Sequence, residues 1–130
     1  MKSGNSLKKG ALGEKLALEE LLRHGLVFIG SNIRLGHKEI DLIMDGLDAI
    51  HFVEVKSRCS FETSGMGGPF GPIAKINREK RLRLLKAADS YLKSKNILKD
   101  AVFDIVLVNF GSNGKPDIEV IEDAFNAITG

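Results

Sequence analysis

The chain has little cysteine, which limits its covalent and metal chemistry. Among its 130 residues Cys59 is the single cysteine. No disulfide can therefore form within the chain, and an all-cysteine zinc cluster is excluded. A single cysteine also favours a reducing compartment. We expect a cytoplasmic protein that is stabilised by a hydrophobic core, which a chain of this length can bury without cross-links.

Long hydrophobic runs are also absent. Residues 1–9 are polar and basic and lead into no apolar stretch, unlike a signal peptide. No segment reaches the length of about 20 apolar residues that a membrane-spanning helix needs. We therefore expect no membrane association. The hydrophobic fraction of 43% and the charged fraction of 28% are typical of globular proteins, and the length favours one domain over residues 1–130, with residues 1–6 as a mobile tail.

Hydrophobic periodicity predicts seven elements along the chain. They are helices over residues 7–24 and 76–94, and strands over residues 27–33, 39–44, 49–57, 101–109 and 117–121. Gly25 stands where a helix C-terminal glycine is expected, and residues 58–73 are rich in glycine and proline, as in a loop. The order α-β-β-β-α-β-β predicts an α/β fold with a mixed central sheet flanked by helices.

The second and third strands form a predicted hairpin with charged residues at alternate positions. The Asp-Gly turn at residues 45–48 joins them. Residues two apart on a strand share a face, so Glu39 and Asp41 share one, and so do Glu54 and Lys56. If Asp41 lies opposite Glu54, or two residues to either side of it, all four groups converge, whereas a slip of one residue separates the acids. The apolar pattern favours convergence, with one common buried face of Ile40, Leu42, Val53 and Val55.

Converging carboxylates repel each other unless a cation lies between them. Mg²⁺ or Mn²⁺ suits such a site, because Mg²⁺ prefers oxygen ligands and retains waters for substrate phosphates. We expect Asp41 and Glu54 to bind the metal, together with the backbone carbonyl of Val55. Lys56 would orient or activate a water and stabilise the charge that builds on a phosphate.

These residues resemble a known nuclease signature. Asp41 followed by Glu54-Val55-Lys56 is similar to the PD-(D/E)XK motif of restriction endonucleases and archaeal Holliday junction resolvases. Further strings extend the resemblance over residues 7–108: Gly13-Glu14, Glu39-Ile40-Asp41-Leu42-Ile43, Phe52-Val53-Glu54-Val55-Lys56-Ser57-Arg58, Lys80-Arg81, Tyr91-Leu92 and Phe103-Asp104. Together they resemble the bacterial YraN-like family. The resemblance implies a restriction-endonuclease-like fold with an α-β-β-β-α-β core.

Two residues depart from the pattern of those families. Lys38 precedes Glu39 where the YraN-like family usually has glycine, which would alter the turn or add a phosphate contact. Ile40 stands in place of the proline that gives the signature its name, a common variation that leaves the acids unchanged.

Several further residues are candidates with more than one reading. A helical acid such as Glu14 is usually only solvated. Related nucleases, however, often bring an acid from the first helix into the site, which makes Glu14 a candidate ligand, with Gly13 allowing close approach of the helix to the sheet. Glu39 is a further catalytic candidate, as an extra ligand, a supporting acid or a partner of Lys56. Strand parity turns His51 away from Glu54. We interpret Asp104 as a structural acid that forms hydrogen bonds.

Basic residues near the second helix predict a nucleic-acid contact. They follow the glycine-rich loop that leaves the predicted active strand, so a role in tracking phosphates is reasonable, although such runs are often only solvated faces. The candidates for nucleic-acid binding are Arg58, Lys75, Arg78, Lys80 and Arg81. The net charge of +2 neither requires nor excludes this partner.

The leading hypothesis for function is a metal-dependent endonuclease that hydrolyses phosphodiester bonds of DNA, with branched or damaged DNA among its substrates. One alternative is a non-catalytic nucleic-acid-binding or protein-interaction module on a nuclease-like fold, and another is a structural protein in a larger complex. Junction-cutting relatives act as dimers, so a homodimer remains an open alternative for this chain.

Overall fold

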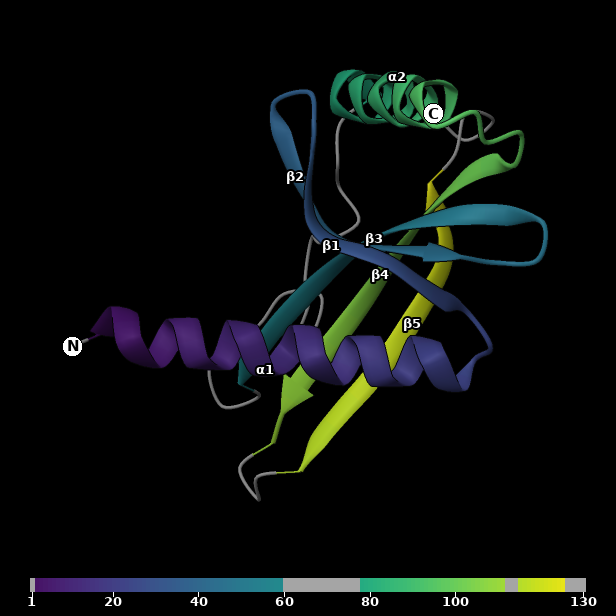
Figure 1. Cartoon of the computed structure of the whole chain (residues 1–130). Helices are drawn as coiled ribbons and strands as arrows, with labels where there is room; N and C mark the ends of the chain where they lie inside the picture. The colour runs from purple at the N-terminus through teal and green to yellow at the C-terminus, as the bar shows by residue number, and fades with distance from the viewer. Residues whose placement is uncertain (1, 60–77, 112–114, 126–130) are drawn as a thin grey trace.

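The computed structural model describes residues 2–59, 78–111 and 115–125, and Figure 1 shows their arrangement. The elements in chain order are α1 (Lys2–Arg23), β1 (Val27–Leu35), β2 (Lys38–Asp45), β3 (Ala49–Cys59), α2 (Arg78–Ser94), β4 (Asp100–Phe110) and β5 (Pro116–Phe125). The predicted α/β class and the predicted order of elements are confirmed.

The five strands form one mixed sheet in the order β1-β2-β3-β4-β5. β3 and β4 are parallel and pair without a break from Ala49 and Asp100 to Cys59 and Phe110. The other neighbours are antiparallel. Parallel neighbours need a long crossover, and α2 lies within the connection from β3 to β4. The mixed sheet predicted from the sequence is therefore confirmed.

The first helix is longer than predicted at its N-terminus. It begins at Lys2 rather than at Leu7, so it includes residues that were expected to form a tail. Extending a helix that has already formed adds one hydrogen bond per residue, and no proline interrupts residues 2–23. At the other end Gly25, with φ of 93°, terminates the helix as predicted. The N–H of Leu26 donates to the carbonyl of Leu21, as in a Schellman motif.

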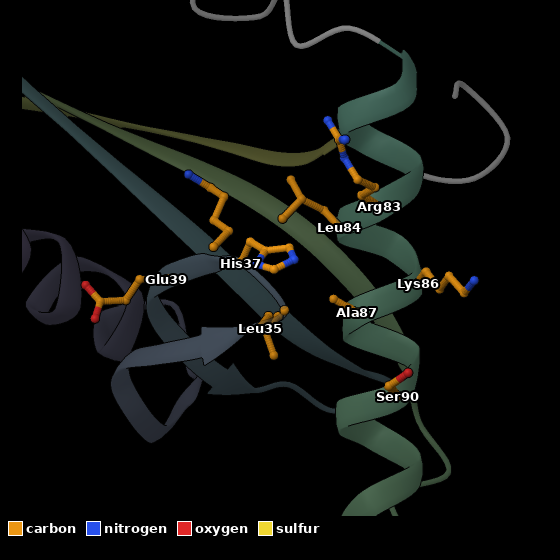
Figure 2. A pocket seen from close by; sticks show the side chains of 10 residues that line it. Leu35, His37, Glu39, Arg83, Leu84, Lys86, Ala87 and Ser90 are labelled. Carbon is orange, nitrogen blue, oxygen red and sulfur yellow. The ribbon is translucent and has the colours of Figure 1, made fainter.

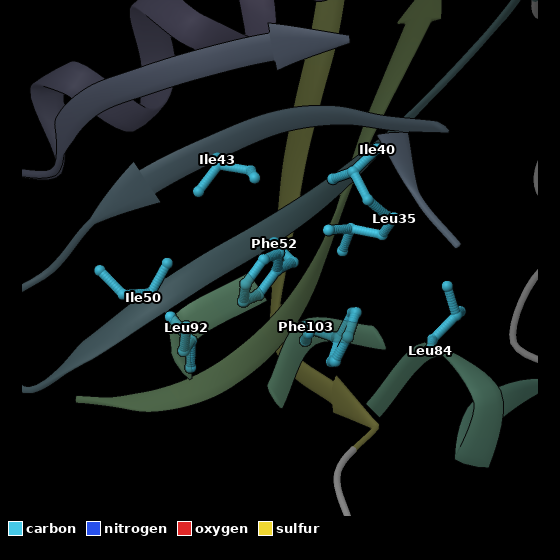
Figure 3. Close-up of a cluster of buried hydrophobic side chains, with 9 residues drawn as sticks. Leu35, Ile40, Ile43, Ile50, Phe52, Leu84, Leu92 and Phe103 are labelled. Carbon is cyan, nitrogen blue, oxygen red and sulfur yellow. The ribbon is translucent and has the colours of Figure 1, made fainter. Parts of the chain in front are cut away.

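Two hydrophobic clusters lie on opposite faces of the sheet. The cluster beneath α2 centres on Phe52, which stacks on Phe103 with ring centroids 5.4 Å apart (Figure 3). Phe52 also meets Tyr91 edge-on, with ring centroids 5.9 Å apart. The cluster beneath α1 includes Ala17, Leu21, Leu42, Val53 and Val106. Neighbouring residues of β3, Phe52 and Val53, belong to different clusters because side chains alternate across a strand.

One predicted buried face is wrong in part. Leu42 and Val53 are buried in the α1 cluster, and Val55 packs against it, but Ile40 belongs to the α2 cluster, where Figure 3 shows it beside Leu35. The pairing of β2 with β3 ends at Leu42 and Val53. Ile40 lies beyond that point and pairs with Ile33 of β1. The residues of β2 that precede Leu42 are therefore separated from β3, and Ile40 lies toward α2.

Neither α1 nor α2, the helices of the described ranges, is long and apolar enough to cross a membrane.

Candidate metal-binding site

The candidate site lies where β2 and β3 separate. Leu42 is opposite Val53 and Asp45 is opposite Ile50, where the pairing of the two strands is regular. Asp41 and Glu54 each lie one residue beyond the last pair. In the same register Ile40 would face Val55. The Oδ2 atom of Asp41 instead accepts a hydrogen bond from the N–H of Val55 at 2.8 Å. Because β2 separates from β3 here, the Asp41 carboxylate takes the place of a β2 carbonyl as the acceptor for the Val55 N–H.

Glu54 lies between two ammonium groups. Its Oε2 is 2.8 Å from Nζ of Lys56, and its Oε1 is 3.4 Å from Nζ of Lys38. Burial raises the pKa of Glu54, but the hydrogen bond and charge of Lys56 and the charge of Lys38 more than offset it, so the pKa lies below its ordinary value. Glu54 is therefore held as a carboxylate.

Asp41 has the opposite electrostatic balance. Burial is the largest influence and raises the pKa of Asp41, and the negative charge of Glu54 raises it further. The Val55 N–H and the charges of Lys38 and Lys56 lower it without cancelling the rise. The fold thus makes Asp41 harder to ionise than a carboxyl group in water, and a divalent cation beside it would oppose that effect.

α1 brings a third carboxylate toward the site. Burial raises the pKa of Glu14, and the charges of Asp41 and Glu39 add to the increase. The preceding residue, Gly13, explains the close approach, because a Cβ there would collide with Oγ of Ser57 on β3. The predicted role of Gly13 in helix–sheet approach is confirmed. Glu14 is near enough to feel the site's charge, and its role as a ligand stays a prediction.

Glu39 is exposed and lies opposite Arg34 of β1. The ammonium of Lys56 pairs with Glu54, so among the described residues the ion pair considered between Glu39 and Lys56 is not formed. Figure 2 shows the Glu39 carboxylate directed away from His37 and α2. Its remaining effect is electrostatic, through the pKa of Glu14.

The oxygen donors fit a small hard cation that keeps part of its water shell. Within residues 2–59, 78–111 and 115–125, no group of three or more His, Cys, Asp or Glu side chains is arranged to hold a metal ion. Mg²⁺, however, binds through one or two carboxylates and retains several waters. Asp41 and Glu54 supply two. The N–H and C=O of one strand residue point to the same side, so the Val55 carbonyl shares the Asp41 side of β3.

Lys38 is the site residue that the sequence did not identify as a partner of Glu54. Alternation along a regular strand places Lys38 on the face opposite Asp41. The residues of β2 before Leu42 are separated from β3, which changes that relation. The ammonium of Lys38 therefore reaches Glu54. The pattern of residues contains no signal of this bend.

The structure describes the side chains of three of the five residues predicted to contact nucleic acid. Arg78 is exposed at the start of α2, Arg81 is half-buried one turn later, and Arg58 is half-buried near the end of β3. Lys80 belongs to α2, but its side chain, like the whole of Lys75, lies outside the described residues. Arg78, Lys80 and Arg81 therefore share the first turns of one helix.

A second ionic pair lies on the other face of β3. Nδ1 of His51 is 2.6 Å from Oδ2 of Asp104, and Oδ1 of Asp104 accepts a hydrogen bond from the N–H of Asp123 at 2.8 Å. The hydrogen bond to Asp104 raises the pKa of His51 despite partial burial. Both predictions are confirmed, since His51 points away from Glu54 and Asp104 is a structural acid.

Comparison with other proteins gives one consistent family. The family model described as "Uncharacterised protein family UPF0102" matches residues 13–108. A UPF0102 protein of Clostridium kluyveri is 37% identical over 119 residues, covering 89% of this chain and 92% of its own. One from Shewanella sediminis is 39% identical, covering 82% and 86%. One from Pseudomonas paraeruginosa is 33% identical, covering 95% and 96%.

Proposed function

We propose, from the premise that this chain belongs to the uncharacterised protein family UPF0102, that it is a metal-dependent endonuclease acting on DNA phosphodiester bonds. One observation carries the proposal. Asp41 and Glu54 meet where two strands separate, and burial together with the Glu54 charge raises the pKa of Asp41. Crowded carboxylates with a lysine beside them are costly in a fold and useful in phosphate chemistry. The resemblance to PD-(D/E)XK nucleases points the same way.

The proposed metal is Mg²⁺ or Mn²⁺, held by Asp41, Glu54 and the Val55 carbonyl, with Glu14 as a further carboxylate. When bound, such an ion neutralises phosphate charge and lowers the pKa of a coordinated water. The chain's own contribution is to hold these oxygens at the end of the paired hairpin. The Val55 N–H fixes the Asp41 carboxylate at 2.8 Å, so one ligand is positioned before any ion binds.

Lys56 provides the positive charge in this proposal. Its ammonium is 2.8 Å from Glu54, and its side chain is 47% exposed, so it can reach a substrate at the surface. There it orients the attacking water and stabilises the charge that develops on the phosphate. Lys38, 3.4 Å from Glu54, supplies a second cation that keeps the Glu54 carboxylate ionised.

A second candidate function is a non-catalytic module that binds nucleic acid or a protein. The two ammonium groups around Glu54 favour it, because they neutralise that carboxylate without a metal. The raised pKa of Asp41 favours the nuclease instead, since a binding surface for DNA gains nothing from another buried acid. A metal-induced rise in melting temperature separates the two, because an ion that binds only the folded state stabilises it.

The experiment is cleavage of labelled duplex, single-stranded, flap and four-way-junction DNA with Mg²⁺ or Mn²⁺. Wild type is run beside Asp41→Ala, Glu54→Ala and Lys56→Ala, with thermal melting as the folding control. We expect cleavage by wild type and its loss in all three folded variants. Branched or damaged DNA is the proposed substrate, in the cytoplasm. No cleavage of any DNA, together with no metal-induced rise in melting temperature, would overturn the proposal.

A further inference from the structure

A groove of about 780 Å³ lies between the β1–β2 turn and α2. Its inner wall is apolar, with Leu35 from β1 and Leu84 and Ala87 from α2. Figure 2 shows the His37 ring on the strand side, with Leu84 and Ala87 facing it from the helix. A Cβ on Gly36 would touch Ala87, so the turn and the helix are in close contact at this end. The volume is that of a pocket for a small organic molecule.

Positive charge surrounds this apolar groove. Lys38, Arg83 and Lys86 line it together with His37, and Glu39 is the one acid among the lining residues that the structure describes. Arg83 and Lys86 are exposed on α2, and Figure 2 shows the Lys86 side chain directed away from His37, so Arg83 supplies the helix charge nearest to a ligand in the groove. A lining that combines apolar and imidazole surface with surrounding cations matches a nucleotide, whose base is flat and apolar and whose phosphate is anionic.

The groove adjoins the proposed metal site. Lys38 lines the groove, and its ammonium is also 3.4 Å from Glu54. A DNA strand whose phosphate reached Glu54 and Lys56 would therefore have a neighbouring nucleotide beside Lys38. A base that is stacked and paired in a duplex cannot enter a pocket of this kind without leaving the helix, whereas an unpaired base can.

We propose that this groove holds an unpaired nucleotide of the substrate, so that the protein prefers single-stranded or branched DNA over an intact duplex. The inference rests on the proposed function for the position of the cleaved phosphate. Ala87 and the His37 ring contact the base, because an imidazole is one of the rings on which bases stack. Arg83 and Lys38 contact the phosphates that flank it.

The test measures DNA binding by fluorescence anisotropy with EDTA, so that no cleavage takes place. The probes are labelled oligothymidine, an abasic oligomer of the same length and phosphate charge, and a blunt duplex. We expect wild type to bind oligothymidine at least about fivefold more tightly than the abasic oligomer, the effect of one stacked base. His37→Ala should remove that difference. Equal affinity for the two oligomers, or a difference that survives His37→Ala, would overturn the groove proposal.

A matched pair of charge reversals tests the surrounding cations. Arg83→Glu should weaken oligothymidine binding by about tenfold and reduce its salt dependence. Lys93→Glu makes the same type of charge reversal on α2, but Lys93 is not among the lining residues and pairs with Asp89 at 3.1 Å. It should change the affinity by less than about twofold. Equal losses in both variants would indicate only a general charge effect and would contradict the proposal.

The two proposals fail in distinguishable ways, because binding in EDTA needs no metal. Base-dependent binding by wild type, with no cleavage and no metal-induced rise in melting temperature, would support the groove proposal and overturn the nuclease proposal. The opposite result would be cleavage that depends on Asp41, with equal rates on duplex and single-stranded DNA and no effect of His37→Ala on binding. That result would support the nuclease proposal and overturn the groove proposal.

Discussion

Two groups of ionisable side chains lie on opposite faces of β3, and their energetics differ. His51 and Asp104 form a satisfied pair, in which the Asp104 carboxylate is 2% exposed and accepts bonds from His51 and the Asp123 N–H. Asp41 and Glu54 form a crowded pair of like charge. Asp41 accepts one bond from Val55, and burial and the Glu54 charge still raise its pKa.

The contrast separates a structural role from a functional one. The His51–Asp104 pair links β3, β4 and β5, so its polar atoms serve the sheet itself. The acids at the end of the β2–β3 pairing add repulsion that the fold does not need. Proteins retain such groups where chemistry or ligand binding requires them.

Breaking the satisfied pair should have the largest effect on stability. Asp104→Ala leaves the His51 ring and the Asp123 N–H without their acceptor, so we expect a loss of about 3 kcal/mol in the free energy of unfolding. Chemical denaturation measures it. Because the pair is on the other face of β3, residual folded protein should keep its metal-induced stabilisation. A loss below about 1 kcal/mol would contradict the structural role.

Removing a charge from the crowded pair should act on function instead. Asp41→Asn keeps an acceptor for Val55 and removes the repulsion with Glu54, so the free energy of unfolding without metal should change by less than about 1 kcal/mol. Cleavage should fall by at least about 10²-fold. Asp45→Asn is the matched control on the same strand, where Asp45 pairs with Lys99 at 2.6 Å, and its cleavage rate should equal that of wild type. A destabilised Asp41→Asn with intact cleavage would reverse the assignment.

The pH dependence of stability should identify the satisfied pair. The hydrogen bond to Asp104 raises the pKa of folded His51 above its ordinary value of 6.5. The stabilisation is therefore complete below that ordinary value and is lost as the pH rises through the raised pKa. We expect the free energy of unfolding to fall over this window in wild type and to stay level in His51→Gln. Denaturation at a series of pH values from about 6 upward measures it, and an equal slope in both proteins would contradict the pairing.

The approach of α1 to the site gives the smallest predicted effect. In Gly13→Ala the new Cβ lies 3.2 Å from Cβ of Ser57 and collides with its Oγ. Overpacking costs about 1–3 kcal/mol, while alanine gains about 1 kcal/mol of helix propensity, so a net loss of about 1 kcal/mol is expected. In a Ser57→Gly background the same substitution should become stabilising. Additive effects of the two substitutions would show that Gly13 does not set this contact.

Much of this comparison could be predicted from the sequence, because it depends on local patterns. The apolar pattern of β2 and β3 favoured convergence of Asp41 with Glu54, and the Glu54 charge does raise the pKa of Asp41, although the paired register ends at Leu42 and Val53. Strand parity predicted that His51 faces away. These predictions hold where strands are regular, as in the unbroken pairing of β3 with β4.

The parts that the sequence did not predict depend on tertiary geometry. β2 is separated from β3 at the residues before Leu42. As a result Ile40 packs in the α2 cluster, and Lys38 forms an ion pair with Glu54. The groove joins His37 to Arg83, which lie on different elements and meet only in the folded chain. Local periodicity contains no information about such a bend or about which helix lies beside a turn.

The measurement that tests the central claim most directly is the broadening of backbone amide NMR signals by Mn²⁺, because the ion broadens only nearby nuclei. The account predicts that the amide signals of Asp41, Glu54 and Val55 broaden first in wild type and remain sharp in Asp41→Asn, whose unchanged spectrum elsewhere shows that it is folded. Broadening confined to His51 and Asp104, or no site-specific broadening in wild type, would contradict a metal site at the end of the β2–β3 pairing.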